Sequence, residues 1–295
     1  MAGLSVSTGE LVALGCALLW ALNGLVLRTQ LTLMSPAAMN AVRCGISGLL
    51  YCLLLPFHQP AVPLAQVPAG AWGLLLLSVI IAIVIGDTLY LTSLKNIGLA
   101  RTMAISSTYP LSTLLFEYVL LQQPVTADLA LGSILVVGGV VFLSGRHQED
   151  EGAAPGRLRQ GIAMALVTSL LWGLGTVLMR PPMEQLTPVQ ANAIRMPVVA
   201  GLLYGLRVLP SGERLALVHH KAMAIVALTG ILGMGVGSYM FLYSLKAIGA
   251  TKTVTLTATS PVFGLVLGGL FLKEKLTVRI ALGTAACLAG VWVVL

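Results

Sequence analysis

An internal repeat covers nearly the whole chain and constrains its fold more than any other feature. The segment GDTLYLTSLKNIGLARTMAISSTYP at Gly86–Pro110 returns as GSYMFLYSLKAIGATKTVTLTATSP at Gly237–Pro261, a displacement of 151 residues. The match keeps its register from the first glycine to the last proline, which is typical of duplication. Two earlier pairs are displaced by 152 residues: LLWALNGLVLR with LLWGLGTVLMR (Leu18–Arg28 and Leu170–Arg180) and SPAAMNAVR with TPVQANAIR (Ser35–Arg43 and Thr187–Arg195).

The composition places both copies in a lipid bilayer. Hydrophobic residues make up 57% of the chain and charged residues only 9%, whereas a soluble domain has about a quarter charged residues. The apolar runs are about 20 residues long, the length that crosses the hydrocarbon core. The net charge of +7 comes from residues between these runs. Membrane topology therefore explains these basic residues, and we expect no nucleic-acid partner.

Ten apolar segments can be marked, five in each copy. Every backbone polar group in hydrocarbon needs an internal partner, so these segments predict helices and an all-α membrane protein. Their predicted ranges are 11–28, 36–57, 69–93, 98–121, 126–145, 159–180, 188–209, 222–245, 249–272 and 277–295.

The odd number of spans in each copy decides how the copies are oriented. After five crossings the second copy begins on the opposite side of the membrane, so ten transmembrane helices form two inverted five-helix repeats. This arrangement occurs in many secondary transporters, with the solute site near mid-membrane between the repeats. We expect a first repeat at 1–145, a charged linker at 146–158 and a second repeat at 159–295.

The loop charges predict the orientation. Twelve Lys and Arg residues lie on one side of the ten spans and three on the side that holds both termini. The positive-inside rule then places both termini outside a cell membrane, plasma or inner. The first ten residues lack a basic n-region, so we expect the first span to remain in the mature, multi-pass chain.

These motifs resemble the drug/metabolite transporter (DMT) superfamily, and in particular its ten-helix EamA-type members. The resemblance covers essentially all 295 residues. It rests on LLW near the start of each copy, Arg43 and Arg195, the GD..Y..SLK.IG..R block, the proline of the fourth span, and KEKLT at Lys273–Thr277. QQPVT at Gln122–Thr126 departs from the pattern, because a Glu usually stands there. The resemblance implies two inverted five-helix repeats around a central cavity, and transport of small organic solutes.

Two arginines and two asparagines are candidate solute-binding residues. Arg43 and Arg195 lie about 10 Å inside their spans, counted from Pro36 and Pro188 at 1.5 Å per residue. Intramembrane charges usually face a polar interior or a partner, so either arginine could bind an anionic group. Snorkelling, or a tie to a neighbouring carbonyl, is the alternative. Asn40 and Asn192 share a helix face with these arginines.

Asp87 and Glu117 are the carboxylates that fall within spans. Their counterparts in the second copy are Ser238 and Gly268, so acidity is confined to the first copy. A desolvated carboxyl could bind and release a proton during transport, which makes both residues candidates for proton coupling. A salt bridge, or a Glu117 that reaches water, is the structural alternative.

Each fourth span contains a proline, Pro110 or Pro261, that we expect to kink the helix and serve as a hinge. Neighbouring polar side chains could contact the solute or bond to the freed carbonyls; the candidates are Ser107, Tyr109 and Ser260. Rings inside spans could line a pocket for an apolar or cationic solute, although helix packing is the alternative for each. These rings are Trp20, Tyr90, Tyr109, Trp172, Tyr239 and Tyr243.

Alternating access by a secondary transporter, with export as its direction, is the function that these features favour. The solute is a small metabolite or drug, with a proton or counter-solute as a further partner. An integral-membrane enzyme or a channel is the alternative. Against an enzyme, no HExxH or GxSxG motif occurs and all four histidines lie in loops. Against a channel, no filter sequence or charged ring is present. The four cysteines lie in apolar spans without metal spacing, so we expect no metal and no cofactor.

Overall fold

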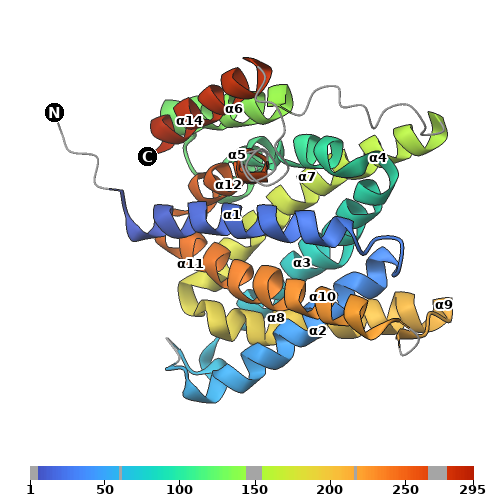
Figure 1. Ribbon diagram of the computed structural model, residues 1–295. Coiled ribbons are helices and arrows are strands. Elements are labelled where there is room, and N and C mark those ends of the chain that lie inside the picture. Colours follow the sequence, from blue (N-terminus) through green and yellow to red (C-terminus); the bar gives the residue numbers. More distant parts are fainter. Residues whose placement is uncertain (1–5, 60–61, 144–154, 216–217, 265–277) are drawn as a thin grey trace.

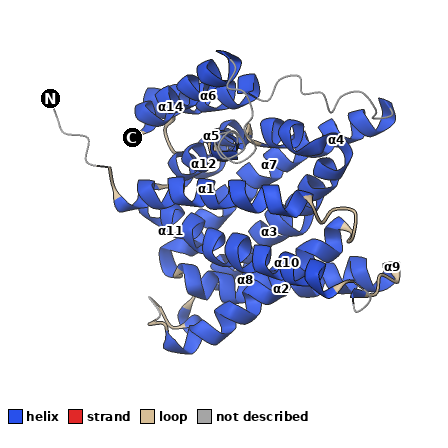
Figure 2. Ribbon diagram, in the orientation of Figure 1, coloured by secondary structure: helices blue, strands red, loops and turns tan. Residues whose placement is uncertain are grey.

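The computed structural model describes residues 6–59, 62–143, 155–215, 218–264 and 278–295, and these residues form helices and no strands (Figure 2). The α-helices are α1 (Thr8–Arg28), α2 (Pro36–Leu54), α3 (Ala69–Val79), α4 (Thr88–Ser106), α5 (Tyr109–Leu121), α6 (Ala127–Leu143), α7 (Pro155–Gln185), α8 (Pro188–Leu203), α9 (Leu209–Ser211), α10 (His220–Thr229), α11 (Ser238–Ile248), α12 (Ala250–Thr257) and α14 (Val278–Val294). Short 3-10 turns η1 (Leu55–Phe57) and η2 (Leu64–Gln66) follow α2, and π-helical segments η3 (Ile80–Asp87), η5 (Tyr204–Val208) and η7 (Gly230–Gly237) interrupt the longer helices.

Side-chain caps fix where several helices begin. The Ser7 hydroxyl accepts a hydrogen bond from the Glu10 amide (3.4 Å), and the Glu10 carboxylate accepts one from the Ser7 amide (2.6 Å). The same reciprocal arrangement joins Thr187 and Gln190 at the start of α8. Ser35 caps α2, where the Ala38 amide donates to its hydroxyl (3.1 Å). Such caps satisfy amides that a helix start otherwise leaves without partners.

Among the residues that the structure describes, six continuous helices are long and apolar enough to cross a membrane. Shorter apolar helices occur at Ala127–Phe142 and Leu282–Val294. The six are Thr8–Leu27, Pro36–Phe57, Ala69–Leu99, Gly156–Gln185, Pro188–Ser211 and His220–Ile248.

The predicted fourth spans are not single helices. Within 98–121, the chain turns at Ser107 and Thr108 between α4 and α5. Within 249–272, α12 ends at Thr257 and a new helix begins at Ser260. Most of the linker at 146–158, the segment 265–272 and KEKLT lie outside the described residues.

The backbones of the two predicted third spans, 69–93 and 222–245, have two features in common. Each becomes π-helical at an equivalent place, in η3 and η7. Each then ends at a glycine, Gly98 with φ 77° and ψ 171° and Gly249 with φ 83° and ψ 172°. This combination of angles is essentially restricted to glycine. The glycine of SLK.IG is therefore required to redirect the chain into the fourth span.

Two equivalent hydrogen bonds join the halves of the chain, one from a serine of each half. The Ser93 hydroxyl of α4 donates to the Gly161 carbonyl of α7 (2.9 Å). At the equivalent place, the Ser244 hydroxyl of α11 donates to the Gly9 carbonyl of α1 (2.9 Å). Figure 1 accordingly shows α1 beside α11 and α7 beside α4. Each half thus holds the first helix of the other.

Small residues bring two further pairs of helices together. In the pair α2–α8, a Cβ on Gly48 would lie 2.9 Å from the Pro197 ring. In the pair α6–α14 (Figure 1), a Cβ on Gly139 would lie 2.7 Å from the Gly283 carbonyl oxygen. Close backbone approach of this kind stabilises helix pairs where lipid supplies no hydrophobic drive between them.

Candidate functional site

A cavity of about 180 Å³ lies between helices from both halves of the chain. Its walls come from α1, α2, η3 and α4 of the first half and from α7, α8, η7, α11 and α12 of the second, together with Tyr109 and Ser260 at the broken fourth spans. Sites for drug-sized ligands usually measure 300–1,000 Å³. The smaller volume limits this cavity to a small solute.

Three charged side chains line the cavity: Arg43 of α2, Asp87 of η3 and Arg195 of α8. Each arginine is only 6% exposed. Arg195 donates from Nη1 to Asn192 Oδ1 (3.0 Å), and Trp172 donates from Nε1 to Asp87 Oδ1 (2.8 Å). The Nε atoms of both arginines are buried without a hydrogen-bond partner. The cavity therefore combines incompletely paired charges with low access to water.

Aromatic rings form much of the remaining wall. Trp172 has its ring centroid 5.1 Å from that of Tyr90 and 5.7 Å from that of Tyr109, which it meets edge-on. Trp20 stacks on Phe241 with centroids 5.4 Å apart. Such surfaces bind apolar or flat parts of a solute, so polar and apolar recognition are both available here.

The broken fourth spans also contribute to the wall. The Tyr109 hydroxyl lies 2.5 Å from Thr257 Oγ1, which joins the two breaks. Thr108 donates its hydroxyl to the Ile105 carbonyl (2.7 Å) and so compensates a helix end. Pro110 is the second residue of α5, where an amide would have no helical partner. The proline therefore starts a helix after a break, in place of the kink expected within one span. Its role as a hinge remains a prediction.

Most of the predicted solute-binding residues surround this one cavity. Those that line it are Trp20, Arg43, Asp87, Tyr90, Ser107, Tyr109, Trp172, Arg195 and Ser260. A direct contact with solute remains a prediction for each of them.

Four predicted residues do not line the cavity. Asn40 donates to the Ile83 carbonyl (3.1 Å). Asn192 accepts the hydrogen bond from Arg195 and a second one from the Ser238 hydroxyl (3.1 Å). Its amide nitrogen donates to the Tyr51 hydroxyl (3.0 Å). These amides are positioning residues because their hydrogen bonds go to the protein. Tyr239 and Tyr243 stack on each other, with centroids 6.4 Å apart, away from the cavity.

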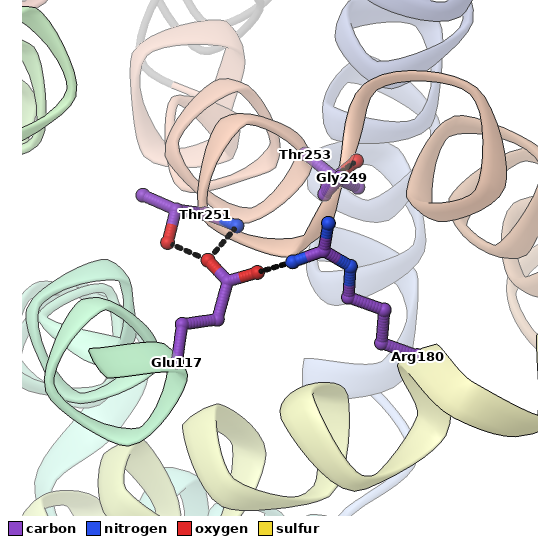
Figure 3. Close-up of polar contacts among 5 residues, drawn as sticks. All are labelled: Glu117, Arg180, Gly249, Thr251 and Thr253. Carbon is purple, nitrogen blue, oxygen red and sulfur yellow. Dashed lines mark hydrogen bonds and ion pairs between the residues drawn. The ribbon is translucent and has the colours of Figure 1, made fainter. Parts of the chain in front are cut away.

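Glu117 also lies outside the cavity lining, in a network that joins both halves (Figure 3). Its Oε1 accepts from Arg180 Nη1 of α7 (2.7 Å), and its Oε2 accepts from the Thr251 amide of α12 (3.1 Å). The Thr251 hydroxyl donates to the same Oε2. Charge-assisted hydrogen bonds of this kind are stronger than neutral ones, so α5 is firmly tied to α7 and to the start of α12.

The residue after Thr251 in α12, Lys252, forms a second ion pair. Lys252 pairs with Glu10, which forms the capping box of α1 together with the N-cap residue Ser7. The two adjacent residues Thr251 and Lys252 thus bind carboxylates from two helices of the first half. We call the set Glu10, Glu117, Arg180, Thr251 and Lys252 the α12 network.

Sequence reasoning missed several residues of the cavity and the partners in the α12 network. Asn23 of α1 lines the cavity, its amide nitrogen donates to the Thr229 carbonyl (2.8 Å), and its Oδ1 has no partner. Phe241 and Thr257 also line it. Asn23 stands in the matched LLWALNGLVLR segment, so an amide on the first span could have been noticed. The pairing of Glu117 with Arg180 carries no sequence signal, because the two residues belong to different halves.

The chain matches a known protein family over two separate segments. The model of the EamA-like transporter family matches residues 7–145 and again residues 159–295. An "Uncharacterized transporter" of Archaeoglobus fulgidus is 24% identical over 274 residues, which is 92% of each chain. A "Putative sugar uptake protein" of Bacillus anthracis is 26% identical over 297 residues, 96% of each chain.

A solved crystal structure shares the fold. It matches with a TM-score of 0.78 at 20% sequence identity, over 98% of this chain and 96% of that chain. Within the described residues, no group of three His, Cys, Asp or Glu side chains is arranged to hold a metal ion.

Proposed function

Because the chain belongs to the EamA-like transporter family, we propose that it moves a small organic solute across the membrane by alternating access of the central cavity. The family and the names of the relatives make this multi-pass membrane protein a transporter and not an enzyme. Its multi-pass character is consistent with a location in the cell membrane.

The cavity is the observation that carries this proposal. It is enclosed by both halves of the chain and is lined by charged, hydroxyl and aromatic side chains from the apolar helices and from the breaks in the fourth spans. Intramembrane charges that face a cavity usually mark a solute pathway. Rocking one half against the other would expose such a site to the two faces in turn.

An inverted repeat of ten spans would supply the two rocking halves. The reciprocal contacts of Ser93 with Gly161 and of Ser244 with Gly9 support it, because each half repeats the other's interaction. The separate family matches to residues 7–145 and 159–295 support the division into 1–145, 146–158 and 159–295. We count the two broken fourth spans, α6 and α14 with the six long helices, which gives ten crossings.

The α12 network is suited to close one face of the cavity. Glu10 lies near the start of α1, and Thr251 and Lys252 lie near the start of α12, whereas Glu117 and Arg180 lie near the ends of α5 and α7. In the proposed ten-span topology α1 and α12 cross the membrane in one direction and α5 and α7 in the other, so the whole network would lie at one face. In the orientation that the loop charges favour, this is the outer face. Closing contacts between the halves there would break when the cavity opens outward.

The proposal also covers the direction of transport and its energy source. We propose export, driven by a proton gradient or by exchange with a counter-solute. Asp87 is the better proton carrier of the two candidate carboxylates, because it lines the cavity whereas Glu117 is held by the α12 network. The charged or titratable groups that share the cavity with Asp87 are Arg43, Arg195, Tyr90 and Tyr109. The name of the Bacillus anthracis relative states uptake of sugar. The transport assay therefore includes sugars and measures both export and uptake.

Solute counterflow in proteoliposomes tests transport. The purified protein is reconstituted in vesicles loaded with one candidate solute, and uptake of the labelled solute from outside is measured. A carrier accumulates label transiently above equilibrium, whereas a channel only equilibrates it.

A cavity-filling variant ties the flux to the cavity. Ser107 is a buried lining residue, and Ser107→Trp should lower the initial rate about tenfold or more by occupying the solute volume. Leu53 of α2 is 62% exposed, so Leu53→Trp should leave the rate unchanged. Equal rates for the two variants would refute transport through this cavity.

A further inference from the structure

We propose that the cavity binds a small organic anion, with Arg43 and Arg195 holding its carboxylate and the aromatic wall holding its apolar body. This inference rests on the proposed transport function and names the class of solute.

The charges of the lining favour an anion. Arg43, Asp87 and Arg195 are the charged residues that line the cavity, so the described lining carries two formal positive charges and one negative charge. Buried charges are costly unless they are paired and hydrogen-bonded. One additional negative charge would balance the lining, and a monovalent anion supplies it.

The hydrogen bonds of the arginines favour the same class. Within the described part of the chain, Arg43 makes no hydrogen bond or ion pair through its guanidinium, and Arg195 makes one bond, to Asn192. Neither arginine forms an ion pair with Asp87, whose carboxylate is instead engaged by Trp172. A guanidinium presents five donors in a planar fork that matches a carboxylate. Both arginines therefore retain donors that the protein leaves unused.

The remaining wall limits the body of the anion. Trp20, Tyr90, Tyr109, Trp172 and Phe241 offer apolar ring surface within a cavity of about 180 Å³. This volume and these rings suit a single small ring or a short alkyl chain. A large polar anion, such as a nucleotide, would exceed the space.

Asp87 makes the inference sharply testable. In a site for an anion, the Asp87 carboxylate repels the solute, so Asp87→Asn should tighten anion binding. If the arginines served only to neutralise Asp87, the same substitution would leave binding unchanged or weaken it.

Binding to the purified, detergent-solubilised full chain is the experiment. The probes are phenylacetate and hexanoate, each beside its amide (phenylacetamide, hexanamide) and the matching amine (2-phenylethylamine, hexylamine), and the readout is thermal stabilisation as a function of probe concentration. We expect the carboxylates to stabilise the protein at concentrations where the amides and amines do not.

The variants connect this preference to the arginines. Arg43→Gln and Arg195→Gln should each weaken carboxylate binding about tenfold or more, and Asp87→Asn should strengthen it by a similar factor. Arg207 is an exposed residue of η5, so Arg207→Gln removes one positive charge away from the cavity and should have no effect. Because Asp87→Asn predicts a gain, the test does not depend on the arginine variants remaining folded.

Each outcome decides between the proposals. Absence of stabilisation by any carboxylate, equal stabilisation by the amides, or weaker anion binding in Asp87→Asn overturns the anion site. Counterflow of neutral or cationic solutes alone would overturn the anion site and leave transport standing. Carboxylate binding with the predicted variant effects but without counterflow would support the anion site and count against transport.

Discussion

Replacing Glu117 with Gln tests whether the α12 network holds one face of the cavity closed. The substitution keeps the size of the side chain but removes the charge that accepts from Arg180 Nη1 and from Thr251. Hydrogen bonds to charged groups are worth about 1.5–3 kcal/mol each. The side chains of Arg180 and Glu117 are 32% and 11% exposed, so water weakens their pairing. We expect a loss of about 2 kcal/mol of the free energy that favours the closed state.

That loss predicts a measurable change in access. A free energy of 1.4 kcal/mol changes an equilibrium tenfold, so about 2 kcal/mol should raise the outward-open population about thirtyfold. The reporter is Thr176→Cys, because Thr176 lines the cavity one turn of α7 before Arg180. Cys52 is the exposed native thiol, and Cys16, Cys44 and Cys287 are buried.

The assay is labelling with a membrane-impermeant maleimide in a Cys52→Ser, Thr176→Cys background. Adding Glu117→Gln should raise the labelling rate about thirtyfold from the face that carries the network. Glu184 lies one turn beyond Arg180 on α7 and is exposed, so Glu184→Gln makes the same change of charge as a control. Unchanged labelling in Glu117→Gln, or an equal rise in Glu184→Gln, would refute the closing role.

Three further predictions concern the backbone, the helix contacts and coupling. Gly249→Ala should lower the free energy of unfolding by about 1–3 kcal/mol because of the positive φ, whereas Gly73→Ala, with open space around its Cβ, should not lower it; thermal unfolding in detergent measures both. Gly139→Ala should destabilise the pair α6–α14 and lower the unfolding temperature, and the adjacent Gly138→Ala, which meets nothing within 4 Å, should leave it unchanged. Asp87→Asn should remove the dependence of flux on an imposed pH gradient while counterflow persists, and gradient-driven flux that survives would exclude Asp87 as the proton carrier.

The sequence predicted the helical membrane class and much of the cavity because polar residues in apolar spans are rare and conspicuous. Arg43, Asp87 and Arg195 stood out for this reason, and the structure brings them to one cavity. The predicted ranges also placed Gly98 and Gly249 at the starts of the fourth spans, and the structure has its two redirecting glycines there. A glycine between two apolar segments can be recognised from the neighbouring sequence alone, because the positive φ at that position depends on the glycine itself.

Features that depend on which helices meet were beyond the sequence. The fourth span was predicted as one kinked helix, but the chain breaks before Tyr109 and Pro110, where Thr108 satisfies the preceding helix end. Asn40 and Asn192 share a face with the arginines as predicted. Their amides nevertheless bond to protein groups, because the partners Ile83, Tyr51 and Ser238 come from other helices.

The reciprocal serine contacts have a consequence for how the chain is made. Gly9 is synthesised 235 residues before Ser244, whose hydroxyl donates a hydrogen bond to the Gly9 carbonyl. Gly161 likewise depends on Ser93. The first half therefore stays incompletely assembled in the bilayer until the second half has been translated as far as Ser244. A chain cut in the middle should regain its structure only when both fragments are produced in the same cell.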